Sequence, residues 1–318
     1  MKLFRPPVKP TPNAALTARS QGKEPRLDIR AILMGVAFAV MWSSAFATAR
    51  IIVAHAPPLA ALSLRFAISG LIAVVVARAL GQDWRLTRGQ AQSVLIFGIC
   101  QNALYLGLNF VAMQSVEASL AVILAASMPL VVALLGWLFL AERVPPLGVA
   151  GLMVGMAGVA LIMITRVSGG ADLAGIALCL GGAVALAVAT LTMRSTAPGG
   201  NLLMIVGQQM LVGSVVLGLV SAMFETIVIR YSVPLILAFA YQVLIPGLAA
   251  TLLWFALVGR IGAVRASAFH FLNPFFGVAI AAIVLGEPVR PLDILGVVVV
   301  MAGILAVQLS RVSETKAA

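Results

Sequence analysis

Hydrophobic residues fill this chain in long uninterrupted runs, separated by short polar stretches. Each run is close to the ~20 residues that an α-helix needs to cross about 30 Å of hydrocarbon. A helix also satisfies its own backbone polar groups, as a bilayer requires. The pattern therefore predicts an all-α membrane protein. The ten expected transmembrane helices occupy residues 31–53, 58–79, 91–113, 117–140, 146–165, 173–193, 201–222, 234–258, 263–286 and 291–309.

The fourth and fifth runs recur in the ninth and tenth, 145 positions later and without a gap. Pro129 corresponds to Pro274, and Glu142 to Glu287. A recurrence at a fixed spacing indicates duplicated structural units. We expect two five-helix repeats flanked by a disordered basic tail and a short C-terminal tail. These four segments are residues 31–165, 172–309, 1–30 and 310–318.

Composition and charge define the environment of the helices. The chain is 62% hydrophobic and 10% charged, whereas soluble domains carry about 25% charged residues, so an ordinary soluble fold is excluded. Sixteen Lys and Arg residues fall in tails and loops on the N-terminal side of the membrane, against four on the other side. The positive-inside rule then places both ends in the cytoplasm. The net charge of +11 reflects this topology, and no nucleic-acid partner is expected.

An odd number of helices per repeat has a consequence for function. The second repeat must enter the membrane from the opposite side, so the two repeats are inverted relative to each other. Inverted repeats are typical of secondary transporters, because one sequence packed in two orientations can open alternately to either face. The pattern therefore favours a transporter, with the lipid bilayer and a small-molecule substrate as its partners.

Several of these features together resemble a known family. They are Trp42-Ser-Ser44 in the first run, Leu64-Arg65-Phe66 in the second, and the doubled Pro and Glu positions. Over about residues 31–310 the chain resembles the EamA-like branch of the drug/metabolite transporter superfamily. The resemblance implies a ten-helix carrier in the bacterial inner membrane that exports metabolites, amino acids or drugs and needs no cofactor. The small four-helix multidrug relatives carry a carboxylate in span 1, and this chain has none there.

Polar side chains near the middle of the runs are the candidate substrate ligands, since transporter sites are expected at this depth between the repeats. Ionisable residues inside a membrane are costly and point to function. Pro129 and Pro274 each remove a backbone donor at mid-membrane, and we expect them to act as hinges. The candidate substrate-binding residues are Trp42, Ser44, Arg65, Asn102, Tyr105, Gln208, Gln209, His270 and Asn273.

Structural alternatives stand beside these roles. Buried Asn and Gln residues often only join neighbouring membrane helices. Arg65 has no acidic residue at its own depth, so it either binds an anionic solute or reaches a carbonyl or Glu117. His270 is either a proton carrier or a neutral, hydrogen-bonded ring. The runs contain no metal-binding motif, and Cys100 and Cys179 are expected to be small buried side chains.

The sequence leaves the transported solute open. Without a carboxylate at mid-membrane, a solute with a carboxylate group is favoured over a lone cation. The alternatives are an intramembrane enzyme, which would need a catalytic constellation that the runs lack, and a proton-coupled carrier that exports cationic drugs. The coupling ion is unassigned, with H⁺ as the candidate. A monomer suffices for this architecture, and an oligomer is also compatible with it.

Overall fold

The computed structural model describes residues 28–139, 145–168, 170, 172–193, 201–262, 266 and 268–317. Across these ranges the regular structure is helical, and the predicted all-α membrane fold is confirmed. Nine helical stretches are long and apolar enough to cross a membrane, and Phe269–Leu285 forms a shorter tenth. Glu142, one of the two repeat-related acids, lies outside the described residues.

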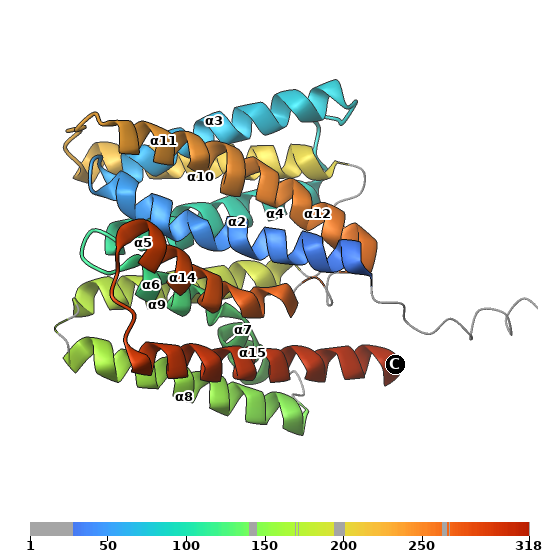
Figure 1. The fold of residues 1–318 in the computed structure, drawn as a ribbon. Coiled ribbons are helices and arrows are strands. Elements are labelled where there is room, and N and C mark those ends of the chain that lie inside the picture. Colours follow the sequence, from blue (N-terminus) through green and yellow to red (C-terminus); the bar gives the residue numbers. More distant parts are fainter. Residues whose placement is uncertain are drawn as a thin grey trace, which may run out of the picture.

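Ten segments run back and forth through one bundle (Figure 1). The first repeat contains α2 (Ile29–Val53), α3 (Pro58–Ala79), α4 (Arg88–Phe97) with η1 (Gly98–Tyr105) and α5 (Leu106–Ala112), α6 (Ala118–Ala126) with α7 (Met128–Phe139), and α8 (Pro146–Ser168). The second contains α9 (Leu173–Met193), α10 (Leu202–Phe224), α11 (Val233–Gln242) with η2 (Val243–Ala249) and α12 (Ala250–Ile261), η3 (Ala268–Leu272) with α14 (Asn273–Leu285), and α15 (Pro291–Ala317).

The two ends of the bundle can be named by their residues. The start of α2 and the end of α15 lie at the same end, here called the Asp28 end (Figure 1). The opposite end, called the Glu287 end, carries the loop that follows α14. Helix α9, the first of the second repeat, starts at the Glu287 end (Figure 1), so the two repeats start at opposite ends, as the odd helix count predicts.

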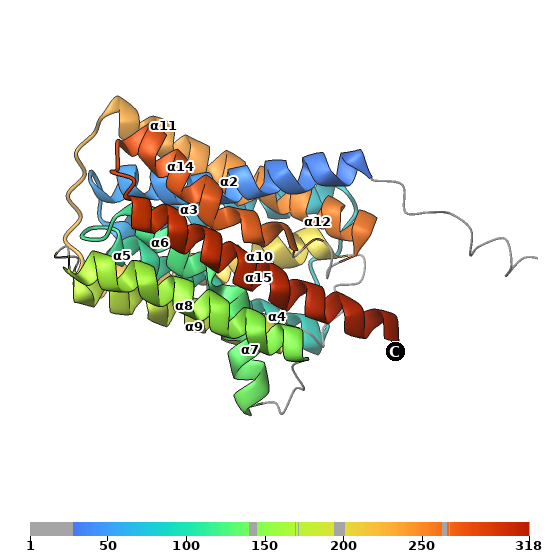
Figure 2. The same ribbon diagram turned by 60° about the horizontal axis from the view of Figure 1, so that its bottom comes forward.

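Helix breaks reproduce the repeat in three dimensions. Span 4 breaks at Ser127 between α6 and α7, and span 9 changes from a 3₁₀-helix to an α-helix after Leu272. These two positions are 145 residues apart, and each lies two residues before a repeat proline. Figure 2 shows α7 directed away from the bundle beyond this break. The prolines thus mark interruptions of the two spans, because proline cannot donate the backbone bond that a continuous helix needs.

A second pair of irregularities was not predicted. Span 3 passes through a π-helix, η1, and span 8 through another, η2, which begins 145 residues after the first. Single π-helical turns are rare and often occur at functional sites. Because both repeats adopt one at the same place, the irregularity belongs to the architecture of the repeat.

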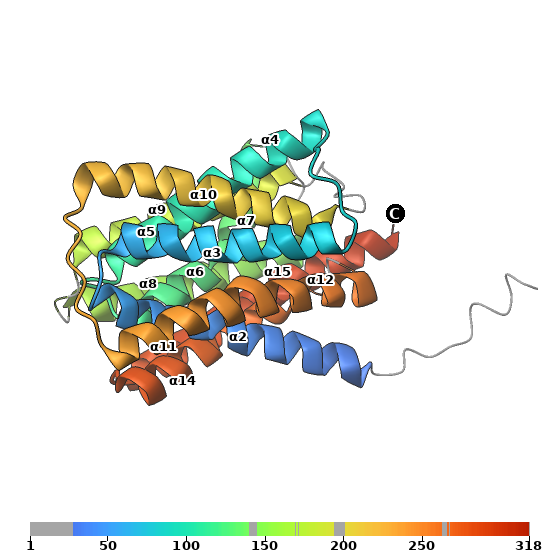
Figure 3. The same ribbon diagram turned by 90° about the horizontal axis from the view of Figure 1, so that it is seen from above.

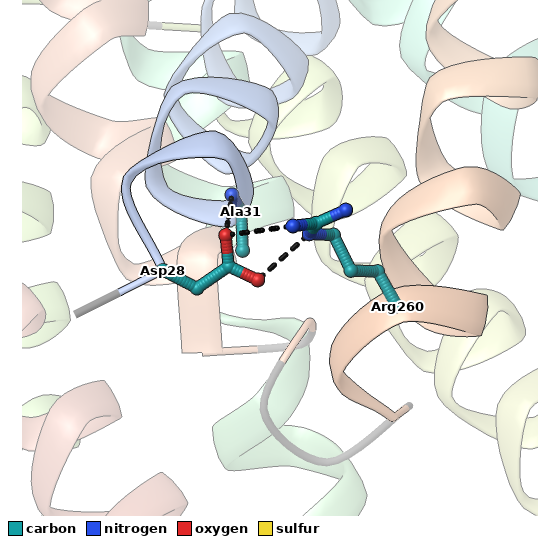
Figure 4. Close-up of polar contacts among 3 residues, drawn as sticks. All are labelled: Asp28, Ala31 and Arg260. Carbon is teal, nitrogen blue, oxygen red and sulfur yellow. Dashed lines mark hydrogen bonds and ion pairs between the residues drawn. The ribbon is translucent and has the colours of Figure 1, made fainter. Parts of the chain in front are cut away.

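Polar contacts between the repeats tie the helix ends. At the Asp28 end, Asp28 accepts from the backbone N–H of Ala31 and forms an ion pair with Arg260, with 2.7 Å between Oδ2 and Nε (Figure 4). At the Glu287 end, Asp172 accepts from the Gly175 N–H and the Ser115 hydroxyl. Ser115 and Arg260 are 145 residues apart. The hydrogen bond from Arg260 lowers the pKa of Asp28 below its usual range, and that from Ser115 does the same for Asp172.

Glycines bring two helix pairs into close contact. Helices α8 and α15 pack along each other, and α3 packs along α10 (Figure 3). A Cβ atom on Gly303 would lie 2.4 Å from the Cα of Gly155, and one on Gly70 would lie 3.0 Å from the Gly207 carbonyl oxygen. Small residues let membrane helices approach through their backbones. These pairs leave α2, α6, α9 and α14 to surround the centre.

Candidate functional site

A small cavity lies in the middle of the bundle, at the helix breaks of spans 4 and 9. Its volume is about 20 Å³, enough for about one water molecule. The walls come from α2, η1, α6, α7, α9, η3 and α14. The lining residues are Trp42, Phe46, Tyr105, Val122, Ala125, Ala126, Met128, Pro129, Leu186, His270 and Asn273. This set is called the central cavity below.

His270 and Asn273 supply the polar wall of the central cavity. The amide Nδ2 of Asn273 lies 3.0 Å from Nδ1 of His270. An amide nitrogen only donates, so Nδ1 accepts and the neutral ring carries its proton on Nε2. The amide oxygen of Asn273 is buried and has no partner among the described residues. Turning the amide over would leave its nitrogen unpaired instead, so in either orientation one polar group is free for a ligand or a water.

The backbone around this pair is held by α2. Ser43, on α2, donates its hydroxyl to the Asn273 carbonyl oxygen at 3.2 Å. Three aromatic side chains pack around the imidazole, with ring centroids 5.1 Å away for Trp254, 5.3 Å for Phe38 and 6.2 Å for Trp42. The neighbouring Phe269 packs against Gly35 of α2. The imidazole therefore has one hydrogen-bonded edge and an aromatic surrounding, which holds the ring in place.

The two repeats contribute unequally to the cavity. His270 is the repeat equivalent of Ala125, and Asn273 is that of Met128; all four residues line the cavity. Equivalent positions thus face each other across the bundle, apolar in the first repeat and polar in the second. This arrangement places the cavity at the interface of the repeats, where transporter sites are expected.

A larger recess opens at the Glu287 end. This recess, called the vestibule below, has a volume of about 480 Å³. Its lining residues are Arg50, Ile51, Val53, Ala54, His55, Gln114, Glu117, Pro234, Leu285 and Glu287. On α2 the vestibule begins at Arg50 and the central cavity ends at Phe46. Four residues correspond to about 6 Å along a helix, so a thin layer separates the two spaces.

Glu287 lines the vestibule and joins span 9 to span 4. Its carboxylate accepts from two backbone N–H groups at the start of α6, those of Ala118 at 2.7 Å and Ser119 at 2.9 Å. These groups have no partner within their own helix, and a negative charge is favourable at a helix N-terminus. The loop after span 9 is thereby fastened to the start of span 4. We call this contact the Glu287 clamp.

Arg65 lies outside the central cavity. It is buried, and its Nε donates to the Gln242 carbonyl oxygen at 3.2 Å. Gln242 donates its Nε2 to the carbonyl of Ala45 and the hydroxyl of Thr48, both on α2. Ser44 contacts the Tyr241 hydroxyl at 2.8 Å. Arg65 and Ser44 thus belong to a second polar group between α2, α3 and α11, which is called the Arg65 cluster.

The amides predicted on spans 3 and 7 have other partners. Asn102 donates to the Gln209 carbonyl oxygen at 2.9 Å and so joins η1 to α10. Gln208 donates to the Trp84 carbonyl oxygen at 3.0 Å, in the loop after α3. The residues that line the central cavity do not include Asn102, Gln208 or Gln209. The structure therefore does not bring these three residues together with the other candidates, and Asn102 acts as a helix-packing residue.

Of the nine predicted ligands, the central cavity collects Trp42, Tyr105, His270 and Asn273. The analysis of the sequence missed Tyr241 and Gln242 of the Arg65 cluster. The sequence does contain a signal for Gln242. Pro246 lies four residues later and cannot donate to the backbone carbonyl of Gln242, which indicates an irregular helix at this point. Across the described residues, no three His, Cys, Asp or Glu side chains are grouped as metal ligands.

Two known proteins similar to this chain carry the name transporter. An uncharacterised transporter of Bacillus subtilis (strain 168), YvbV, is 26% identical over 291 residues, covering 91% of this chain and 95% of its own. An uncharacterised transporter of Archaeoglobus fulgidus is 30% identical over 175 residues, covering 55% of this chain and 61% of its own. A solved structure described only as "Crystal structure of protein" shares the fold, with a TM-score of 0.65 at 21% identity over 90% of this chain and 99% of that one. The model of the EamA-like transporter family matches residues 29–164 and 173–309, and the chain therefore belongs to this family of multi-pass membrane transporters.

Proposed function

We propose that the protein is a secondary transporter that exports a small metabolite, amino acid or drug-like solute across the bacterial inner membrane. The Asp28 end faces the cytoplasm in this proposal, because it carries the excess of Lys and Arg residues. The solute binds in the central cavity, which opens alternately to the two sides.

The observation that carries this proposal is the position of the central cavity. It lies between repeat-equivalent residues of spans 4 and 9, next to the break in each span. A break lets the two halves of a span move separately. On the Glu287 side the cavity ends below a thin layer that the Glu287 clamp holds closed. A binding space flanked by two hinges and one closed gate is what alternating access requires.

The chemistry of the cavity supports a carrier over an intramembrane enzyme. His270 offers one N–H, and Asn273 one unpaired amide group, beside the aromatic surfaces of Trp42, Phe46 and Tyr105. These groups can orient a polar solute by hydrogen bonds and stacking. The described lining contains no nucleophile paired with a base, which an enzyme would need.

The test is transport by purified full-length protein in proteoliposomes. A panel of radiolabelled amino acids, small carboxylates and cationic drugs is measured in both directions, with and without a pH gradient. We expect efflux of at least one solute and its loss in Asn273→Leu, which removes the free amide group. Gln208→Leu removes an amide that bonds to Trp84 instead and should retain transport. Failure of every solute to move, or equal transport by both variants, would contradict the proposal.

A further inference from the structure

Arg65 presents a charge that its protein contacts do not balance. The side chain is 5% exposed and lies seven residues into α3, about 10 Å from the helix start. A charged group at such a depth is costly in a membrane unless it is paired. Within the described part of the chain, Arg65 forms no ion pair. Its one hydrogen bond runs from Nε to the Gln242 carbonyl oxygen, and its guanidinium carbon lies 5.1 Å from the centre of the Phe66 ring, a contact that supplies no negative charge.

That hydrogen bond explains the position of Arg65 but not its charge. Pro246 cannot donate to the Gln242 carbonyl, span 8 is π-helical from Val243 onward, and Nε of Arg65 joins α3 to this irregular stretch. One turn further along α3, Ser69 donates its neutral hydroxyl to the Val243 carbonyl at 3.3 Å. A guanidinium carries five N–H groups, and the four on its terminal nitrogens have no hydrogen-bond partner among the described residues.

A second unpaired group lies in the same cluster. Gln242 is fully buried, and its Oε1 has no partner in the described structure. Its Nε2 is already bonded to Ala45 and Thr48 of α2. Among the residues that the structure describes, the cluster therefore contains a cation without a counter-ion. The amide oxygen of Gln242 only accepts, so a donor such as a water molecule satisfies it, and the charge of Arg65 alone calls for an anion.

The vestibule at the Glu287 end leads toward this cluster. Ser44, Thr48, Ile51 and His55 follow one another at helical spacing, so they lie on one side of α2; the last two line the vestibule. Trp42 and Phe46 precede Ser44 and Thr48 by two positions, about 200° around the helix. The Arg65 cluster and the central cavity thus lie on opposite sides of α2, both beneath the vestibule.

We propose that the Arg65 cluster is a binding site for a monovalent anion, a halide or a carboxylate, that is separate from the central cavity. The guanidinium fork matches two carboxylate oxygens and also holds a spherical anion. The anion enters from the vestibule between α2 and α11 and neutralises Arg65. Binding of the anion does not depend on the proposed function, because it requires no transport.

Thermal unfolding of the purified full-length protein, followed by tryptophan fluorescence, tests the site. The baseline buffer contains sodium MES, a bulky sulfonate, at constant ionic strength, and chloride or acetate replaces it stepwise. A saturable rise in the unfolding temperature is expected, about 5 °C at roughly a hundredfold excess over Kd. A response to chloride alone indicates an inorganic counter-ion, and a response to acetate indicates the carboxylate of a solute.

Three variants complete the test. Arg65→Gln should lose the response, and Arg78→Gln, which removes an exposed cation from the last turn of the same helix, should keep it. Gln242→Glu places a carboxylate in the cluster, so this variant should no longer respond to added anions; it decides the question if Arg65→Gln does not fold. A wild-type protein without any response, or an Arg65→Gln protein that responds like wild type, would overturn the proposal.

Discussion

Replacing Glu287 with Gln should weaken the gate at the Glu287 end. The carboxylate accepts from two N–H groups of α6, whereas an amide keeps one acceptor oxygen and turns an NH₂ group toward the other N–H. A hydrogen bond to a charged group contributes about 1.5–3 kcal/mol. Losing one of the two, about 2 kcal/mol, shifts the equilibrium between closed and open gate by a factor of roughly 30.

The assay is the labelling rate of a cysteine placed in the thin layer. Ala49 lies on α2 between the central cavity and the vestibule and is 1% exposed. In a background without Cys100 and Cys179, Ala49→Cys is treated with a membrane-impermeant maleimide from the Glu287 side. Labelling of the closed protein requires opening, so Glu287→Gln should raise the rate by about the same factor of 30.

Glu225 provides the matched control. Its carboxylate accepts from the N–H groups of Leu59 and Ala60 at the start of α3, both at 2.9 Å, at the same end of the bundle. That contact joins α3 to α10 and does not border the cavity. Glu225→Gln should therefore lower stability without changing the labelling of Ala49→Cys. Equal rates in the parent and Glu287→Gln, or equal increases in both variants, would refute the gating role of the clamp.

Three further predictions follow from other parts of the structure. Gly303→Ala should lower the thermal unfolding temperature, because its Cβ would meet the Cα of Gly155 at 2.4 Å and overpacking costs about 1–3 kcal/mol. Gly259→Ala is the control and should leave the unfolding temperature unchanged, because the space around Gly259 is open. Pro129→Ala and Pro274→Ala should reduce transport at unchanged membrane expression, and full turnover in both would reduce the prolines to packing residues. The stability that Asp28 adds through Arg260 should be present above the usual pKa of Asp, and it should be lost as the pH falls through the lowered pKa of Asp28. The measurement is the difference in unfolding temperature between wild type and Asp28→Asn. A difference that vanishes already at neutral pH would contradict this.

The repeat made much of the fold predictable. Apolar run lengths gave the helices, and the spacing of Pro129 and Pro274 located the interruptions in spans 4 and 9 to within two residues. The π-helices η1 and η2 could not be predicted in the same way. Their sequences, GICQNALY and VLIPGLA, have no evident pattern in common, because the π-turn depends on how each span packs against its neighbours.

Depth along a helix predicted the site only in part. His270 and Asn273 lie at the cavity because the break in span 9 turns both toward the centre. Gln208 has a comparable depth by residue count, but the loop after α3 folds onto α10 and its Trp84 carbonyl takes the amide. Arg65 was expected either to bind an anionic solute or to reach a carbonyl or Glu117; the structure shows the contact with a carbonyl, and the binding of a solute stays a prediction. That carbonyl belongs to Gln242 in span 8, and its position depends on how α3 packs against η2.

Alternating access around the central cavity is the central claim, and labelling of one cavity residue from both sides tests it most directly. Met128 lines the cavity and is apolar, so Met128→Cys can be treated with an impermeant maleimide in membrane vesicles of either orientation. The account predicts that adding Glu287→Gln speeds labelling from the Glu287 side and slows it from the Asp28 side, because opening one gate draws population from the other state. Faster labelling from both sides at once would indicate a continuous pore and contradict the account.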